Sequence, residues 1–401
     1  MKILAIDDQQ LILLPLEKRL TNLGYEVRAE TDAVNSIQLF ESFQPDLVIV
    51  DINMSKEISG LDIIKFIRIL YKSSIPIVVL SGNNETKIIS EAFKLGINDY
   101  MKKPLSLNEI CIRIKRLIGA PKNIDESLLN DVIIQKRCVG LVIPCYNEEN
   151  RLLKDDFLEF IDQNSGYHLC FVNDGSTDNT LSVLKKLKEG RENSISIYDC
   201  KINGGKAEAV RQGMLYLNQF EELDYLGFLD ADLSTDLLDF DELVTTIEKS
   251  NYKIVSGSRI HRMGANISKD SIRGVISLAI NFIICKILQM DFKDTQCGAK
   301  IFDKNIIEIA FKDKFVTKWL FDVEIFVRIK NHFKLEKAKK ILCEKPLKRW
   351  IHVDGSKLSL KDSIKIIFQL GQIAWIYNKQ HLKIKNEKRS YNYNLQQRDV
   401  N

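Results

Sequence analysis

The chain has 401 residues, 45% of them hydrophobic and 28% charged, and its net charge is +4. That length exceeds an ordinary single domain, so we expect two or three globular domains. The small net charge does not indicate a nucleic-acid partner, and no apolar run reaches the roughly 18 residues of a membrane-spanning helix. The eight cysteines include no CxxC pair and histidine occurs five times, which argues against a zinc site. We therefore expect reduced thiols and a cytoplasmic protein.

Residues 1–118 alternate short apolar runs with helical stretches such as LDIIKFIRILYK. This alternation predicts a doubly wound α/β domain on a parallel sheet, in which ligands bind at the carboxyl ends of the strands. The polar side chains expected at those ends are Asp7, Asp8, Asp51, Ser81 and Lys103. The three carboxylates predict a Mg²⁺ site, and Lys103 would neutralise a phosphoryl group on Asp51.

These residues resemble the receiver domain of bacterial response regulators, and the likeness covers the whole segment. The resemblance implies a flavodoxin-like fold and a histidine kinase or phosphotransfer protein as partner. The implied phosphoacceptor is Asp51, and the implied switch residues are Ser81, Tyr100 and Lys103. It also implies a cis Lys103-Pro104 bond. One departure is Met54-Ser55, where the family commonly has Met-Pro.

Residues 119–136 read GAPKNIDESLLNDVIIQK, and Gly119, Pro121 and the polar run IDES predict a linker. Within it, LLNDVII could form a short helix or the edge strand of the next domain. No helix-turn-helix pattern follows the receiver, so we expect an output domain other than a DNA-binding one.

Residues 137–358 again alternate strands and helices, which predicts a second α/β domain with a largely parallel sheet. Chemically useful residues follow each strand. Asp174 is expected to be free to accept hydrogen bonds from a base or ribose, and Lys206 follows two glycines that could approach a phosphate. Asp230 and Asp232 follow an apolar run, so they would share one face and could hold Mg²⁺ or Mn²⁺ if the strand stays extended.

Several strings in this half resemble family 2 glycosyltransferases, which have the nucleotide-sugar-binding GT-A fold. They include LVIPCYNEENRL, FVNDGSTDNT, NGGKAEAVRQGM, LDADLS, DTQCGAKIF and FDVEI. Together with VDGSKL, they extend from about residue 138 to 358. Within the family, the sequence is most similar to dolichyl- or polyprenyl-phosphate glycosyltransferases.

This resemblance implies roles for individual residues. The nucleotide sugar would be bound by Pro144, Tyr146, Glu148, Asp174, Lys206 and Gln296. The implied catalytic residues are Asp230, Asp232, Arg259 and Asp322, of which the first two would hold Mg²⁺ or Mn²⁺. Arg273 and Lys357 would face an acceptor phosphate. One departure is Ser234, where some lipid-phosphate enzymes carry a glutamine that touches the metal.

The predicted reaction is transfer of a sugar, with inversion, from a nucleotide diphosphate sugar to an acceptor, with polyprenyl phosphate favoured. Phosphorylation of the receiver would regulate it. A phosphate acceptor needs no strong base, whereas a protein or saccharide hydroxyl would need one, for which Asp322 and Glu324 are the candidates. The alternative from another class is a signalling adaptor whose second domain binds nucleotide sugar without turning it over.

Two apolar stretches near the carboxyl end are expected to be helical but are too short to span a membrane. They are residues 275–288 and an amphipathic helix within 359–378, which is followed by a polar tail over 379–401. They could lie at a membrane interface, which would be the inner face of the cell membrane, or pack in the core or in a homodimer interface.

Overall fold

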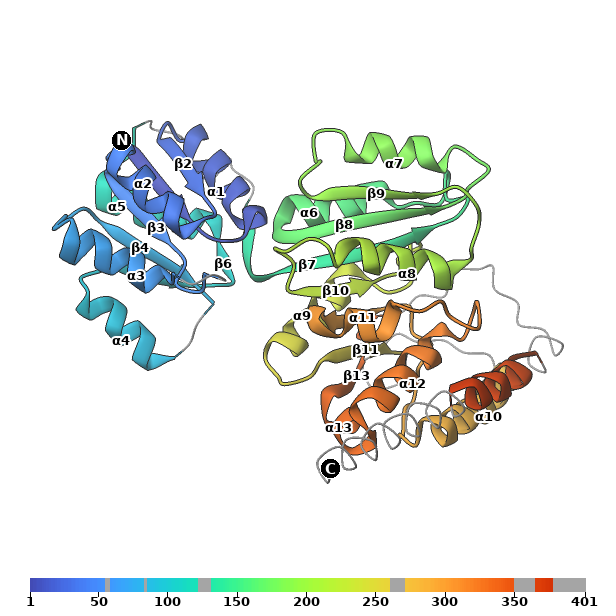
Figure 1. Cartoon of the computed structure of the whole chain (residues 1–401). Coiled ribbons are helices and arrows are strands. Elements are labelled where there is room, and N and C mark those ends of the chain that lie inside the picture. The colour runs from blue at the N-terminus through green and yellow to red at the C-terminus, as the bar shows by residue number, and fades with distance from the viewer. Residues whose placement is uncertain (55–57, 83–84, 122–130, 260–270, 350–364, 378–401) are drawn as a thin grey trace, which may run out of the picture.

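The computed structural model of the chain describes residues 1–54, 58–82, 85–121, 131–259, 271–349 and 365–377. Its first half has five parallel strands in the order β2-β1-β3-β4-β5, with helices on both faces (Figure 1). The elements are β1 (Lys2–Ile6), α1 (Gln10–Asn22), β2 (Glu26–Glu30), α2 (Ala33–Phe43), β3 (Leu47–Val50), α3 (Gly60–Lys65), β4 (Ile77–Ser81), α4 (Thr86–Lys94), β5 (Asp99–Lys102), β6 (Leu105–Ser106) and α5 (Leu107–Ile118). A short π-helical turn, Phe66–Leu70, extends α3.

The sequence explains where these elements begin. Every residue of β3 and β4 is buried, as expected for central strands covered on both faces. Three helices begin at a side-chain cap: Asp32 caps α2, Ser59 and Asp62 form a capping box on α3, and Ser106 caps α5. The predicted doubly wound domain is therefore confirmed.

The second half is a larger sheet in the order β13-β11-β12-β10-β7-β8-β9. The pairs β10–β7, β7–β8, β8–β9 and β11–β13 are parallel, whereas β12 runs antiparallel to both its neighbours. The elements are β7 (Ile133–Cys145), α6 (Lys154–Gln163), β8 (Asn164–Asp174), α7 (Thr180–Lys188), β9 (Ile195–Cys200), α8 (Lys206–Leu217), β10 (Tyr225–Phe228), α9 (Leu237–Glu248), β11 (Ile254–Ser258), α10 (Ser271–Leu288), β12 (Lys300–Asp303), α11 (Ile307–Phe311), α12 (Phe321–Phe333), α13 (Leu335–Ile341) and β13 (Leu342–Pro346).

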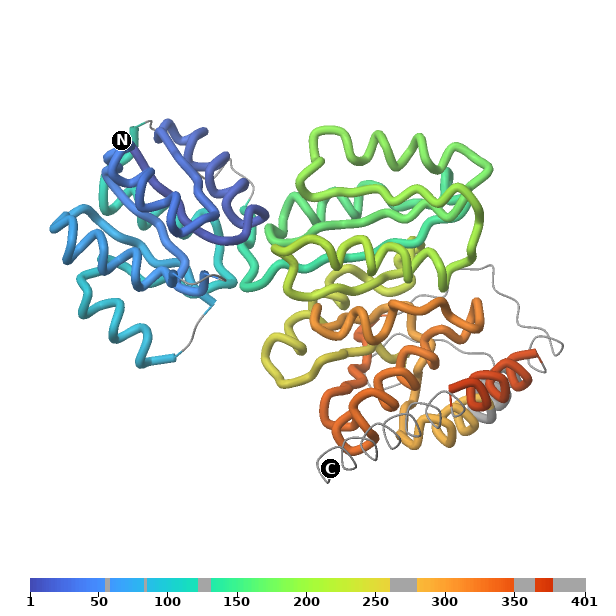
Figure 2. The backbone as a smooth tube through the Cα atoms, viewed as in Figure 1, coloured from blue at the N-terminus to red at the C-terminus, as the bar shows by residue number. Residues whose placement is uncertain are grey.

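Strand β7 joins the two halves, as the tube in Figure 2 shows. Residues 133–136, expected in the linker, already belong to this strand, and its first residues pair antiparallel with β6 of the first domain. Helix α1 packs against the start of β7 and β8, where Ser165 Oγ donates to the Leu11 carbonyl at 2.7 Å. Ile12 and Ile134 are fully buried in the same apolar cluster, so the two domains share a hydrophobic core.

The apolar stretches at the carboxyl end form helices α10 and residues 365–377. One side of the second helix is buried, and its Tyr377 hydroxyl donates to Glu324 in α12 at 2.8 Å. The other side exposes aromatic rings, as does α10: Phe368, Trp375 and Phe282. No helix in the described part of the chain is long and apolar enough to cross a membrane. All eight cysteines are free thiols.

The carboxyl end of α9 supplies a testable pH dependence. Burial raises the pKa of Glu248 to about 7, although Lys136 opposes the rise. Its native pKa lies above the unfolded value, so the folded state binds the proton more tightly and stability falls as pH rises from about 4.5 to about 7. We expect Glu248→Gln to stabilise the protein by about 1–3 kcal/mol at pH 8 and to have little effect at pH 4.

Urea unfolding at the two pH values measures this difference. Glu189→Gln, at an exposed position after α7, is the control and should change stability equally little at both. A gain from Glu248→Gln that is the same at pH 4 and pH 8 would contradict the prediction.

Candidate functional site

The first domain carries a buried ion cluster at the carboxyl ends of its strands. Lys103 Nζ donates to Asp51 Oδ2 at 2.8 Å and to Asp7 Oδ2 at 2.5 Å, and all three side chains are nearly inaccessible to solvent. Burial raises the pKa of Asp7 to about 7, against the pull of Lys103. Burial disfavours the Lys103 ammonium, but the two carboxylates outweigh that effect and raise its pKa. The Lys103-Pro104 bond is cis, as the resemblance implied.

The other predicted receiver residues surround this cluster. Ser81 is fully buried at the end of β4, and Tyr100 on β5 is half-buried beside it. Burial raises the pKa of the Tyr100 hydroxyl, which is hydrogen-bonded to Ser81. Asp8 and Asp51 line one pocket, whereas Asp7 is taken up by Lys103 and by the Gln9 N–H at 3.0 Å.

Mg²⁺ accepts oxygen ligands of this kind, so the donor set Asp8 and Asp51 fits it. The predicted Mg²⁺ site of Asp7, Asp8 and Asp51 is not already assembled in this structure. Within the described residues, no three His, Cys, Asp or Glu side chains are arranged to hold a metal ion.

The second domain gathers its polar residues at the ends of β7, β8 and β10. Pro144 is the last residue but one of β7, and Tyr146 follows the strand with 45% of its surface exposed. The Glu148 side chain is largely buried. Its Oε1 accepts from Arg151 at 2.8 Å, and its Oε2 has no hydrogen-bond donor among the described residues. Burial raises the pKa of Glu148, partly against Arg151 and helped by the charge of Asp232.

Asp230 and Asp232 lie in a turn, not in an extended strand. Strand β10 ends at Phe228, and the turn closes with the Leu233 N–H donating to the Asp230 carbonyl at 3.2 Å. Leu233 adopts a left-handed conformation, with φ 49°. Asp232 Oδ1 accepts from the Ser234 N–H at 2.9 Å. The two carboxylates therefore reach the site from successive corners of a turn, and the expected extended arrangement is wrong.

The glycine-rich loop before α8 is tied to β8 by Asp174. Its two carboxylate oxygens accept from the Gly204 and Gly205 N–H groups, each at 2.8 Å. Asp174 is thus engaged in positioning the loop, and the expectation that it is free to receive a base or ribose is not met. The loop delivers Lys206 to the first turn of α8, where its Nζ forms an ion pair with Asp230. Burial opposes the Lys206 charge, but Asp230, Asp322 and Asp232 together raise its pKa.

Behind Asp230 lies a buried pair that the sequence did not predict. Lys300 Nζ donates to Asp322 Oδ1 and to the Cys297 carbonyl, both at 2.6 Å, and the lysine is fully buried. Burial raises the pKa of Asp322 despite Lys300 and Lys206. Asp322 therefore reaches the site as one partner of a buried salt bridge.

Gly298 is a second residue that the sequence analysis missed. A Cβ atom at this position would lie 2.1 Å from Asp230 Oδ2, so any side chain would displace that carboxylate. The glycine within DTQCGAKIF was the available signal, but its reason becomes visible only when Asp230 is placed beside it. Gly298 leaves the carboxylate the space that any side chain at this position would fill.

We expect Gly298→Ala to reduce sugar transfer about 100-fold with little change in the unfolding midpoint, because the methyl group moves Asp230 while the surrounding core is kept. Gly371→Ala is the matched control, since nothing lies within 4 Å of a Cβ there. Steady-state rates and thermal unfolding of both variants test this. Normal turnover by Gly298→Ala would show that the position of Asp230 is unimportant.

Arg259 faces Asp294 and not open space. Its Nε and Nη2 bond both oxygens of Asp294, at 2.7 and 2.8 Å, in a bidentate pair. Burial opposes the charge on Arg259, but Asp294 raises its pKa, and Arg259 in turn lowers the pKa of Asp294. Gln296, which lies two residues after Asp294, is exposed. For the catalytic role that the resemblance implies, Arg259 would have to share or leave Asp294.

The remaining predicted residues divide into two groups. Glu324 accepts from the Val316 and Thr317 N–H groups, the Thr317 hydroxyl and Tyr377, so it holds the loop before α12. Arg273 lies in α10 with its side chain outside the described part, and Lys357 lies outside the described residues.

The transferase-like site offers oxygen atoms to a cation. Glu148 Oε2 is buried and receives no hydrogen bond within the described part of the chain, whereas Asp230 Oδ1 is in direct contact with the Lys206 ammonium. Buried carboxylate oxygens without donors are costly unless a positive charge satisfies them. The donor set therefore fits Mg²⁺ or Mn²⁺.

The fold and site define a receiver joined to a transferase domain of the α/β class. Residues 3–115 match the response regulator receiver domain, and residues 141–308 match the glycosyl transferase family 2 domain. The chain belongs to glycosyl transferase family 2, and a response regulator receiver domain precedes its transferase domain.

Two curated relatives and one solved structure illustrate the similarity. The chain is 32% identical over 260 residues to a dolichyl-phosphate beta-glucosyltransferase of Saccharomyces cerevisiae, covering 60% of this chain and 75% of that protein. It is 29% identical over 280 residues to one of Trichomonas vaginalis, covering 66% and 82%. Glucosyl-3-phosphoglycerate synthase from Mycobacterium tuberculosis, solved with Mn²⁺, uridine diphosphate and glucosyl-3-phosphoglycerate, covers 60% of this chain and 80% of its own at 14% identity and a TM-score of 0.44.

Proposed function

We propose that this chain transfers a glucosyl group, with inversion, from a nucleotide diphosphate sugar to a polyprenyl phosphate, and that phosphorylation of Asp51 controls the rate. The names of the curated relatives support the sugar and the acceptor class. The observation that carries the proposal is the charged cluster at the strand ends, where Glu148 Oε2 is buried without a hydrogen-bond donor among the described residues and the Lys206 ammonium pairs with Asp230.

The transfer forms a bond from an acceptor phosphate oxygen to the anomeric carbon while the bond from that carbon to the diphosphate breaks on the opposite face. A divalent cation held by Asp230 and Asp232 would neutralise the charge that develops on the departing diphosphate. Lys206 places an ammonium beside Asp230 and would bind the same phosphates. Pro144 near the end of β7, with Tyr146 and Glu148 just after it, would hold the base and ribose.

The contacts of the two candidate bases favour a phosphate acceptor over a hydroxyl. A hydroxyl acceptor requires a base, and the two candidates are Asp322 and Glu324. Asp322 is paired with Lys300, and Glu324 accepts four hydrogen bonds. An ionised phosphate needs neither of them. Arg273 and Lys357 remain the proposed contacts for that phosphate.

Two further features of the proposal concern regulation and location. Asp51 would receive a phosphoryl group from a histidine kinase or phosphotransfer protein, with Mg²⁺ held by Asp8 and Asp51. The exposed rings of Phe282, Phe368 and Trp375 would contact the inner face of the membrane that holds the lipid acceptor.

The test is release of nucleoside diphosphate from UDP-, GDP- and dTDP-sugars by the full chain, with Mg²⁺ or Mn²⁺ and with or without a short polyprenyl phosphate. We expect release that requires metal and increases with the lipid, and NMR of the product should show the inverted anomer. Donor binding without release, in every combination, would instead support the signalling adaptor. Phosphorylation that leaves rate, donor affinity and oligomeric state unchanged would contradict the regulatory part.

A further inference from the structure

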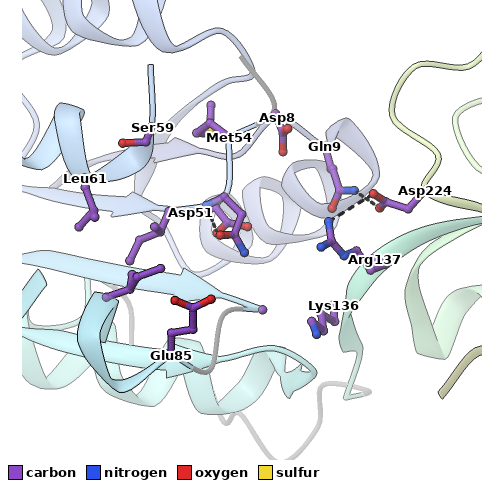
Figure 3. Close-up of a pocket in the computed structure, with 14 residues that line it drawn as sticks. Asp8, Gln9, Asp51, Met54, Ser59, Leu61, Glu85, Lys136, Arg137 and Asp224 are labelled. Atoms are coloured by element: carbon purple, nitrogen blue, oxygen red, sulfur yellow. Dashed lines mark hydrogen bonds and ion pairs between the residues drawn. The ribbon is translucent and has the colours of Figure 1, made fainter. Parts of the chain in front are cut away.

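A pocket of about 790 Å³ lies between the two domains, at the phosphoacceptor (Figure 3). Its receiver side includes Asp8, Asp51 and Glu85. Its transferase side is made by the beginning of β7 and the residue before β10: Lys136, Arg137 and Asp224. The carboxylate that would accept a phosphoryl group therefore shares a pocket with two cations of the other domain.

The receiver's own cation at this pocket, Lys103, is shared between two carboxylates. Lys103 is already bonded to both Asp7 and Asp51, and Asp8 adds a third carboxylate nearby. A phosphoryl group would increase the negative charge and bring three further acceptor oxygens. Lys103 and a Mg²⁺ ion at Asp8 and Asp51 would meet part of this charge, and cations across the pocket would supply further donors.

Lys136 is held against the receiver. A Cβ atom on Gly82, the residue after Ser81, would lie 2.6 Å from Lys136 Cγ, so the lysine stem lies directly over this backbone. The acids near Lys136 are Glu248, whose pKa it lowers, and Glu85, which lines the same pocket. Lys136 thus lies over the backbone next to the switch hydroxyl, while its charge acts on the partly buried Glu248.

Arg137 is held by a contact that can be exchanged. Its Nη1 donates to Asp224 Oδ1 at 3.3 Å, and 40% of the arginine side chain is exposed, so the pair contributes little stability. Asp224 keeps two better donors, Gln9 Nε2 at 2.7 Å and the Cys138 N–H at 3.0 Å. Both of these donors bond Oδ2, and the Asp224 side chain is 27% exposed, so water can replace Arg137 at Oδ1 when the arginine moves to a stronger, bidentate anion.

We propose that Lys136 and Arg137 form the transferase half of a composite phosphoryl-binding site, so that a phosphoryl group on Asp51 binds both domains at once. This inference rests on the proposed phosphorylation of the receiver. In that step an Asp51 oxygen bonds to phosphorus, the bond from phosphorus to the donor nitrogen of a phosphohistidine breaks, and the imidazole leaves.

The site connects directly to the transferase strands. Lys136 and Arg137 lie near the beginning of β7, and the same strand ends at Cys145, next to the transferase site. Asp224 immediately precedes β10, which leads to Asp230. A phosphoryl group that draws Arg137 from Asp224 would change contacts at the start of both strands.

The experiment measures binding of beryllofluoride, a phosphoryl analogue, with Mg²⁺ to the full chain by isothermal titration calorimetry. We expect Lys136→Met to weaken binding about fivefold and the double variant with Arg137→Met at least tenfold, while Lys136→Arg keeps most of the affinity. Lys185→Met, on exposed α7, is the control and should bind as the unaltered chain does. Lys136→Met keeps the stem over Gly82, so it tests the charge even if the double variant folds poorly.

The outcomes separate the two hypotheses. Equal affinity of the unaltered chain and Lys136→Met, with Asp51→Asn abolishing binding, overturns the composite site and leaves regulation by phosphorylation standing. Absence of binding by the unaltered chain overturns both. In either case the transferase assay described above is unaffected as a test of the reaction.

Discussion

Replacing Asp232 with asparagine is expected to lower sugar transfer by about 10²–10³-fold without unfolding the protein. The amide has the same shape and keeps an oxygen for the Ser234 N–H, which donates to Asp232 at 2.9 Å. What it loses is the negative charge that acts on Glu148 and Lys206 and that would hold a cation. The measurement is metal-dependent release of nucleoside diphosphate under saturating donor.

Asp156→Asn, on the exposed surface of α6, provides the matched control and should retain full activity. If Asp232→Asn kept more than a third of the activity, Asp232 would have no direct part in the reaction. Isothermal titration of Mn²⁺ would give an independent answer, since the variant should bind the ion more weakly even where turnover is too slow to measure.

Replacing Lys300 with methionine is expected to reduce the free energy of unfolding by about 3–5 kcal/mol. The methionine stem can occupy the space near the rings of Phe228 and Phe326, over which the ammonium lies at 5.5 and 5.9 Å. The ammonium itself is lost, which leaves Asp322 buried without its hydrogen-bonded cation. Breaking one side of a buried pair costs more than the pair contributes, because the remaining charge stays desolvated.

The control for Lys300→Met is Arg191→Met. Arg191 pairs with Asp162 at 3.0 Å on the surface, with side-chain exposures of 34% and 55%, and such a pair contributes about 0–1 kcal/mol. Urea unfolding followed by circular dichroism compares the two variants. A loss for Lys300→Met no larger than the loss for Arg191→Met would mean that Asp322 is neutralised by proton uptake or by Lys206.

The alternation of strands and helices along the chain, and the strand ends that carry the polar residues, could be predicted from the sequence. Apolar runs that are buried on both faces, such as β3 and β4, indicate strands clearly because their short length and flanking turns are typical of a strand. Polar residues that follow such runs were placed together because the carboxyl ends of parallel strands meet at one edge. Asp51, Lys103 and Asp230 are all near those ends in the structure.

The pairing of side chains could not be predicted. Arg259 and Asp294 are 35 residues apart along the chain. Asp174 accepts a hydrogen bond from the N–H of Gly204, which is 30 residues away. Which donor meets which acceptor depends on loop conformations, which no periodic pattern encodes. The turn at Asp230–Asp232 was not predicted for the same reason, because the left-handed backbone conformation of Leu233 has no signature in the sequence.

Strand β7 also determines how far the two halves of the chain can be separated. Its first residues form a ladder with β6, and Ile134 is buried in an apolar cluster that includes Ile12 of the receiver. A transferase fragment that begins at residue 131 would keep β7 but lose β6. It would expose unpaired backbone groups of β7 and an apolar surface, both of which promote aggregation. The receiver thus supports the beginning of the transferase sheet, and separating the halves would expose apolar surface that each now covers on the other.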